Sequence, residues 1–196
     1  MENEDPGKIV PPEPYVAIPV IIALSYSMEV AALRDFYAKL LAKSMIIDTK
    51  DQVHPAFVEI IKQMSPIDAE NIGLFRSSRV ITVCKFIPAE KDFKDYKGTQ
   101  LQVFYESPPH QNNTEQSISI ASLIRLGLIE TIYDDALQDK KVNVDDFVRT
   151  ERWFELVNSI ERELDPETYI NQANMRFREG RAILTEFGKA FLKTVT

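Results

Sequence analysis

The hydrophobic period of this 196-residue chain changes near residue 79, and that change constrains the fold more than any other feature. From residue 15 to about residue 75, apolar side chains recur at steps of three and four, which is typical of amphipathic helices. Between residues 79 and 106 the segments "RVITVCKFI" and "TQLQVFYES" are rich in β-branched and aromatic residues, which favours strands. We therefore predict an α+β fold, mainly helical, in which a helical layer precedes a small antiparallel sheet.

The helical layer is predicted to span residues 15–78. It follows an N-terminal segment, residues 1–14, which is rich in proline and acidic residues and is expected to be extended or disordered. Ser65 followed by Pro66 is a helix-start signal, with serine as the N-cap and proline at the first helical position. The four helices expected in this layer are a short apolar helix from Tyr15 to Ser25, a long helix from Met28 to Met45, and helices starting at Pro55 and Pro66.

The C-terminal part, residues 79–196, is predicted to mix strands and helices and to pack with the helical layer as one compact unit. A helix with Thr114 as its N-cap should run to Leu126 and stop at Gly127. The segment "LIETIY" is expected to be a strand, and "RFREGRAIL" a hairpin tip turning at Glu179-Gly180 followed by a strand. A helix over residues 143–164 belongs to an insertion at about 134–170, and Thr185 should cap the last helix.

The order of these elements resembles a winged helix-turn-helix. In that fold a recognition helix runs into a leucine-glycine-leucine step, a β-hairpin wing follows, and a final turn leads into the last helix. Leu126-Gly127-Leu128 and Leu184-Thr185 with Phe187-Gly188 match the two landmarks. About fifty residues separate them, more than a plain wing needs, so the helix at 143–164 would be inserted into the wing.

The whole chain resembles the Abi-alpha family of bacterial abortive-infection proteins, over roughly residues 15–195. The blocks that carry this resemblance are "LRDFYAKLLAKSM", "DQVHPAFVEIIKQMSPIDAENI", "LIRLGLIE" and "LTEFGKAF". The resemblance implies a role in phage defence and supplies no catalytic residues.

The negative charge of the chain is concentrated in one segment. The net charge is −7, and the segment from Asp134 to Glu167 holds eleven acids against five bases. The segment also holds an apolar stripe around the only tryptophan, Trp153, which should pack inward. The outer face is either an ordinary solvated surface or a surface for a basic partner, with these candidate residues: Asp145, Glu151, Glu155 and Glu163.

Nucleic-acid binding is expected to be weak. The candidates for contact with DNA are three arginines in "MRFREGR", Arg176, Arg178 and Arg181. The helix that would read the major groove carries Glu115 and Arg125 as its only charges, which is too few for such a helix. Its exposed side chains are expected to be uncharged and polar: Gln116, Ser117, Ser119 and Ser122.

No set of residues with catalytic spacing stands out. Cys84 lies between apolar neighbours and should be a small buried hydrophobe. His54, which precedes Pro55, is expected to brace the start of a helix, and His110 lies in a polar loop. No glycine-rich phosphate loop or metal-ligand spacing is present, so we expect neither an enzyme nor a bound cofactor or metal.

The predicted function is that of a cytoplasmic component of bacterial phage defence that acts through protein–protein contacts. The cytoplasm is favoured because the first ten residues are acidic rather than signal-like and the longest apolar run has ten residues. The alternative is a winged-helix DNA-binding transcriptional regulator, and a third class is a nuclease or other toxic effector built from scattered residues. The sequence does not define the protein partner, and a homo-oligomer is one of the alternatives.

Overall fold

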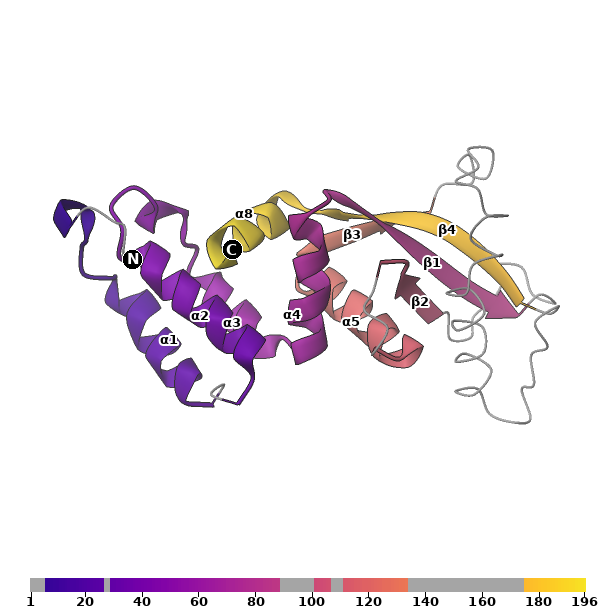
Figure 1. Cartoon of the computed structure of the whole chain (residues 1–196), viewed down its shortest axis with the longest axis horizontal. Helices are drawn as coiled ribbons and strands as arrows, with labels where there is room; N and C mark the ends of the chain where they lie inside the picture. Colours follow the sequence, from indigo (N-terminus) through magenta and orange to yellow (C-terminus); the bar gives the residue numbers. More distant parts are fainter. Residues whose placement is uncertain (1–5, 27–28, 89–100, 107–110, 134–174) are drawn as a thin grey trace. The chain divides into compact units, whose positions relative to one another are not determined.

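A computed structural model describes residues 6–26, 29–88, 101–106, 111–133 and 175–196 (Figure 1). The predicted insertion at 134–170, with its helix over 143–164 and the candidate partner surface of Asp145, Glu151, Glu155 and Glu163, lies outside the described residues, as does His110. The described residues group into two units. The first unit comprises residues up to Arg79, Ser122–Ile129 and Leu184–Thr196, and the second comprises the described parts of Val80–Ala121 and Glu130–Ile183.

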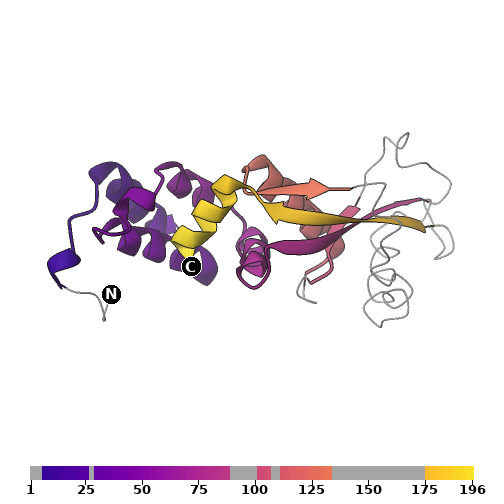
Figure 2. The same ribbon diagram turned by 90° about the horizontal axis from the view of Figure 1, so that it is seen from above.

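The first unit is helical, and its central helix is α2 (Ala31–Ser44), which contacts four other helices (Figures 1 and 2). These are α1 (Pro14–Tyr26), α3 (Ala56–Gln63), α4 (Pro66–Gly73) and α8 (Glu186–Val195). The side chains of Tyr37 and Leu40 on α2 are fully buried, whereas Leu41, also expected on the buried side, is half-buried. The helical layer expected from the apolar period is therefore formed.

Two helix starts in the first unit follow the signals in the sequence. The Ser65 hydroxyl accepts a hydrogen bond from the Asp68 backbone N–H at 3.1 Å, and the Asp68 carboxylate accepts one from the Ser65 N–H at 2.8 Å. This reciprocal pair satisfies N–H groups that have no partner inside the helix. Pro66 occupies the first turn, as predicted. The predicted apolar helix likewise forms as α1, which starts one residue early at Pro14 and has Pro19 inside it.

The N-terminal segment is ordered where the structure describes it. Residues Pro6–Lys8 form a 3-10 turn, η1, and Ile9 then pairs with Ile46 in an isolated antiparallel bridge. The Val10 N–H donates to the Met45 carbonyl at 2.8 Å. Short 3-10 turns also follow at Lys50–Gln52 (η2) and Leu74–Arg76 (η3).

The second unit contains a four-stranded sheet in the order β2-β1-β4-β3. Strand β1 (Val80–Pro88) pairs antiparallel with both β2 (Leu101–Phe104) and β4 (Met175–Leu184), and β3 (Ile129–Ile132) flanks β4. The predicted antiparallel pairing of the first two strands is confirmed. Helix α5 (Asn113–Arg125) lies beside β2, where the Ser117 hydroxyl accepts a hydrogen bond from the Gln102 N–H at 3.1 Å.

The turn predicted at Glu179-Gly180 is wrong. Strand β4 runs without interruption through both residues, and Gly180 pairs with Val83 of β1. A Cβ at Gly180 would lie 2.5 Å from Cδ1 of Tyr133 and 2.6 Å from the Ile132 carbonyl oxygen. Glycine is therefore needed here because the ring of Tyr133 and the backbone of Ile132 approach closely. Close approach of another group is a common reason for glycine inside a strand.

The start of α5 also differs from the prediction. The helix begins at Asn113, and its cap is Asn112 rather than Thr114. The Asn112 Oδ1 accepts a hydrogen bond from the Glu115 N–H at 2.7 Å, while the Glu115 carboxylate accepts one from the Asn112 N–H at 3.4 Å. A reciprocal capping pair therefore forms at this end of the helix, with asparagine in place of the predicted threonine.

The two landmarks of the winged-helix resemblance contact each other within the first unit. Gly127 adopts a φ of 71°, a left-handed conformation that favours glycine. The Thr185 hydroxyl donates to the Gly127 carbonyl at 2.6 Å, and the Thr185 N–H donates to the Leu128 carbonyl at 3.1 Å. A Cβ at Gly188 would lie 1.9 Å from the Leu128 carbonyl oxygen, so the two backbones can meet only at a glycine.

This contact predicts a large difference between two glycine-to-alanine substitutions. Gly188→Ala should lower the free energy of unfolding by at least about 2 kcal/mol, because the added methyl overlaps backbone rather than a movable side chain. Gly73→Ala is the matched control: it lies in α4 with nothing within 4 Å of the position that its methyl would take, and should gain roughly 0.5–1 kcal/mol. Urea unfolding followed by circular dichroism measures both, and equal effects would contradict the close contact.

Cys84 is a buried hydrophobe, as predicted, with 2% of its surface exposed. Burial raises the pKa of the Cys84 thiol to about 12, with smaller contributions from the charges of Glu179 and Glu106. At pH 8 the thiolate fraction should therefore be roughly 10⁻⁴, against about a quarter for an exposed cysteine.

We accordingly expect Cys84 to react with a thiol reagent at pH 8 at least about 100-fold more slowly in the folded chain than in the denatured chain. Absorbance of the released chromophore from a disulfide reagent gives both rates. Comparable rates in the folded and denatured chain would show that the thiol is not protected by burial.

Candidate functional site

The three arginines proposed from the sequence do not form a wing tip. Arg176, Arg178 and Arg181 all lie within strand β4, opposite Ile87, Lys85 and Thr82 of β1, respectively. Because side chains alternate along a strand, Arg178 and Arg181 leave opposite faces. Arg178 donates to the Tyr133 carbonyl at 3.0 Å, which gives it a structural role in the second unit. Contact of these arginines with nucleic acid stays a prediction.

The uncharged polar side chains expected on the exposed face of α5 are buried or half-buried, which corrects the expectation for this helix. Gln116 and Ser119 are buried, with 1% and 2% of their surfaces exposed, and Ser122 is half-buried with its hydroxyl bonded to Asp68 at 3.2 Å. Ile118 and Ile124 are exposed instead. The polar side chains are thus used inside the protein, and the helix presents few groups that could read bases.

Helix α1 carries the largest exposed apolar stripe among the described residues. Its four large exposed side chains recur at helical spacing, with exposed fractions of 54–60%: Tyr15, Ile18, Ile21 and Ile22. The opposite side of the helix is buried through Val16, Val20 and Ala23. No charged residue occurs in α1. We call this stripe the apolar face of α1.

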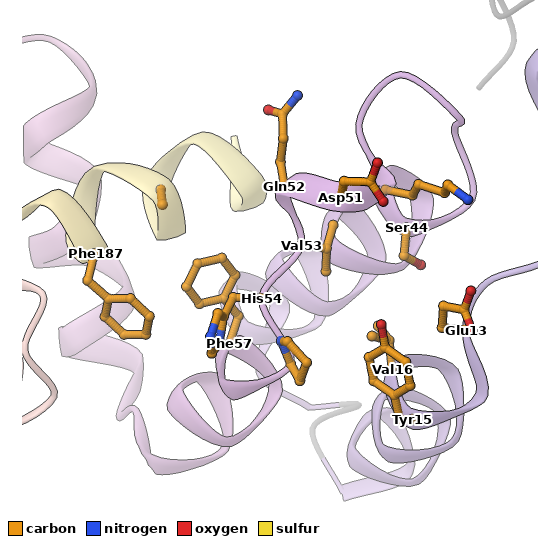
Figure 3. A pocket seen from close by; sticks show the side chains of 13 residues that line it. Glu13, Tyr15, Val16, Ser44, Asp51, Gln52, Val53, His54, Phe57 and Phe187 are labelled. Carbon is orange, nitrogen blue, oxygen red and sulfur yellow. The ribbon is translucent and has the colours of Figure 1, made fainter.

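A pocket of about 440 Å³ adjoins the apolar face of α1, because Tyr15 lines both (Figure 3). The opposite wall is aromatic and is made by His54 and Phe57 at the start of α3 and by Phe187 of α8. The lining is therefore contributed mainly by the four helices α1, α2, α3 and α8 and the turn η2. Concave, partly aromatic surfaces of this size are typical of binding sites.

His54 is fixed in this wall by a backbone hydrogen bond and by ring contacts. Its Nδ1 accepts a hydrogen bond from the Ala56 N–H at 3.1 Å, so the predicted bracing of the helix start is confirmed. A neutral ring that accepts at Nδ1 carries its proton on Nε2. The ring centroid lies 5.7 Å from those of both Phe57 and Phe187. No group of three metal-binding side chains occurs among the described residues.

Charged residues surround the apolar surface without entering it. Glu13 and Asp51, together with Lys50, lie at the rim of the pocket, and Glu29 is exposed beyond the other end of α1. The hydroxyl of Ser44 in the pocket donates to the Leu41 carbonyl at 2.7 Å. The arrangement offers apolar contact area framed mainly by carboxylates, which suits binding more than bond-making chemistry.

Sequence reasoning predicts α1 but misses its exposed face. The available signal is the composition of the helix, "PYVAIPVIIALSY", which is apolar on all sides. A helix that is apolar on all sides is normally either buried on all sides or covered by a partner on the side that its own chain leaves exposed. Its apolar run also raises the question of a membrane span, and no helix among the described residues has the length and apolarity that crossing a membrane requires.

The fold and the site define an α+β protein with a helical unit that presents an exposed apolar surface. The chain belongs to the abortive infection alpha family, whose model matches residues 2–195. The resemblance inferred from the sequence blocks is thereby confirmed at the level of the family. No curated protein and no solved structure matches the chain.

Proposed function

We propose that this protein is a cytoplasmic component of bacterial phage defence that acts through protein–protein contacts and without catalysis of its own. Membership of the abortive infection alpha family ties the chain to abortive infection. The observation that supports protein contact is the apolar face of α1, with its adjoining pocket. Clustered apolar side chains that stay exposed on a folded unit are characteristic of interaction surfaces.

The apolar face of α1 has enough surface to contribute to an interface. Ile18, Ile21 and Ile22 each keep more than half of their surface exposed. Burying the remaining part of one isoleucine contributes about 1 kcal/mol, so the three together contribute roughly 3 kcal/mol. Tyr15 adds an aromatic ring whose hydroxyl can hydrogen bond at the edge of the pocket, as is frequent in interface hot spots.

The charges around the apolar face indicate the chemistry of the partner. Glu13 precedes α1 and Glu29 follows it, while Asp51 lies at the pocket rim. A protein segment with an apolar centre and basic residues on either side would complement this pattern. An anionic membrane surface would be repelled by the same carboxylates and by the net charge of −7. The acidic candidates Asp145, Glu151, Glu155 and Glu163 would favour the same kind of partner.

A winged-helix-like arrangement of the C-terminal part belongs to this proposal as a scaffold for protein contact. It is supported by the element order α5-β3-β4-α8 and by the contact between Thr185 and the Gly127-Leu128 step. The alternative of a DNA-binding regulator gains no support from α5, whose exposed face carries Ile118 and Ile124.

Phage challenge of cells that carry the gene tests the proposal. The double variant Ile18→Gln with Ile21→Gln should lose protection while it remains folded, because glutamine keeps helix propensity and removes the apolar area. The matched control is Ile9→Gln with Ile47→Gln, two isoleucines of similar exposure outside α1, and it should protect as the unchanged chain does. Phage titre and host survival are followed together, and circular dichroism reports folding.

Several results would reject the proposal. Normal phage yield over a broad panel with the unchanged gene would remove the defence role. If the folded α1 variant protected as well as the unchanged chain, the apolar face of α1 would not be the contact surface. Binding of the purified chain to vesicles of zwitterionic lipid, lost in the same variant, would replace the protein partner with a lipid surface.

A further inference from the structure

A second hollow in the first unit has a different character from the pocket beside α1. It has a volume of about 720 Å³ and lies between the connection that follows α4 and the helix α8. Its rim carries four basic side chains: Arg76, Arg79, Lys189 and Lys193. Its floor is apolar, with Phe75, Leu184 and Leu192 all buried. Its lining contains no Asp or Glu side chain and also includes Thr196, the last residue of the sequence. We call this site the basic hollow.

The positive charges of the basic hollow are mostly uncompensated within the described part of the chain. Only Lys189 has an ion-pair partner there, with its Nζ 2.6 Å from the carboxylate of Glu186, and that pair is exposed to solvent. Exposed pairs of this kind contribute little and exchange readily for another anion. Arg76 lies with its guanidinium carbon 6.0 Å from the centre of the Phe36 ring, which orients the group without neutralising it.

A further lysine, Lys43, lies next to the basic hollow and has a lowered pKa. Lys43 of α2 donates through its Nζ to the backbone carbonyl of Lys193. Burial lowers the pKa of Lys43 below its usual range, and the charges of Lys193 and Lys39 lower it further. Five lysine and arginine side chains therefore lie on or near α8 in a protein whose net charge is −7.

We propose that the basic hollow binds a soluble small molecule that carries a polyphosphate group. Two arginines can each form paired hydrogen bonds to phosphate oxygens, and two lysines supply point charges beside them. The hydroxyl of Ser77 lies in the same lining, where it donates a long hydrogen bond of 3.5 Å to the Leu74 carbonyl that a phosphate oxygen could replace. The volume fits a ligand the size of a nucleotide, and the apolar floor offers contact to the uncharged part of such a molecule.

The small extent of the basic hollow favours a short polyphosphate over a nucleic acid. A short polyphosphate experiences the local field of the four rim cations, since charges in salt solution are screened beyond about 8–10 Å. A duplex extends far beyond that distance and would also meet the excess of acids elsewhere on the chain. The local cluster thus favours a compact polyanion over a long one.

Calorimetric titration of the full chain at low salt tests the proposal, with sodium tripolyphosphate as the probe. ATP and a short DNA duplex form the second and third arms. The double variant Arg79→Gln with Lys193→Gln removes two exposed rim cations and leaves the Lys193 carbonyl in place, so it should weaken tripolyphosphate binding at least about tenfold. The control is Lys8→Gln with Lys62→Gln, which changes the net charge equally at positions outside the hollow and should shift the affinity less than about threefold.

Each outcome decides the question. Tenfold loss in the hollow variant alone, with both chains melting at the same temperature, supports the proposal, and tighter binding of ATP than of tripolyphosphate would show that the apolar floor takes part. Absence of tripolyphosphate and ATP binding, or equal loss in the control, overturns it. Duplex binding that depends on Arg79 and Lys193 without any tripolyphosphate binding overturns it as well and assigns the hollow to a nucleic-acid backbone. Phage protection is not the readout, so this result is independent of the apolar face of α1.

Discussion

The first unit depends on one backbone contact, in which the turn before α8 lies against the Gly127-Leu128 step. Thr185 bonds through both its hydroxyl and its N–H to the carbonyls of Gly127 and Leu128, and the same hydroxyl accepts from the Gly188 N–H at 2.8 Å. One side chain thereby caps α8 and attaches it to a segment more than fifty residues earlier. Neither glycine tolerates a larger residue, because Gly127 is left-handed and Gly188 touches backbone. The geometry leaves little freedom for where α8 begins.

Fixing the start of α8 also positions the aromatic core of the unit. Phe191 meets Phe36 and Phe57 edge-on, at ring-centre distances of 6.0 and 5.4 Å, and Phe187 lies one turn earlier, 5.2 Å from Phe57. Phe191 is buried between α2 and α3, whereas Phe187 is half-buried and forms a wall of the pocket beside α1. The same helix therefore stabilises the core with one face, shapes a binding pocket at its edge, and contributes two lysines to the basic hollow. The geometry of both candidate sites therefore depends on the Thr185 contact, because that contact fixes where α8 begins.

Local signals in the sequence predict local structure, and they fail where a residue serves a distant contact. The N-caps Ser65 and Thr185 and the burial of Cys84 follow from neighbours within a few positions, and all three are confirmed. Gly180 suggests a turn because turns are the commonest reason for glycine, whereas the actual reason is the ring of Tyr133, which lies far away in the sequence. Likewise Ser122 is expected to be exposed as long as its partner Asp68, more than fifty residues earlier, is unknown. The basic hollow is invisible in the sequence for the same reason, because its four cations occur in two segments more than a hundred residues apart.

The apolar face of α1 and the core below it differ in what they contribute to the folded state. Val16 and Val20 are buried and stabilise the unit, whereas Ile18 and Ile21 remain mostly in water and contribute little of the free energy that burial supplies. Folding of the isolated chain therefore gives no reason for isoleucine rather than a polar residue at those positions, and a helix of ordinary amphipathic composition would fold equally well. A charge-free helix with isoleucines on its exposed side is instead what an interface requires, since the same side chains become stabilising once a partner covers them. In the interface that we propose, the acidic residues before and after α1 would favour partners that carry compensating positive charge.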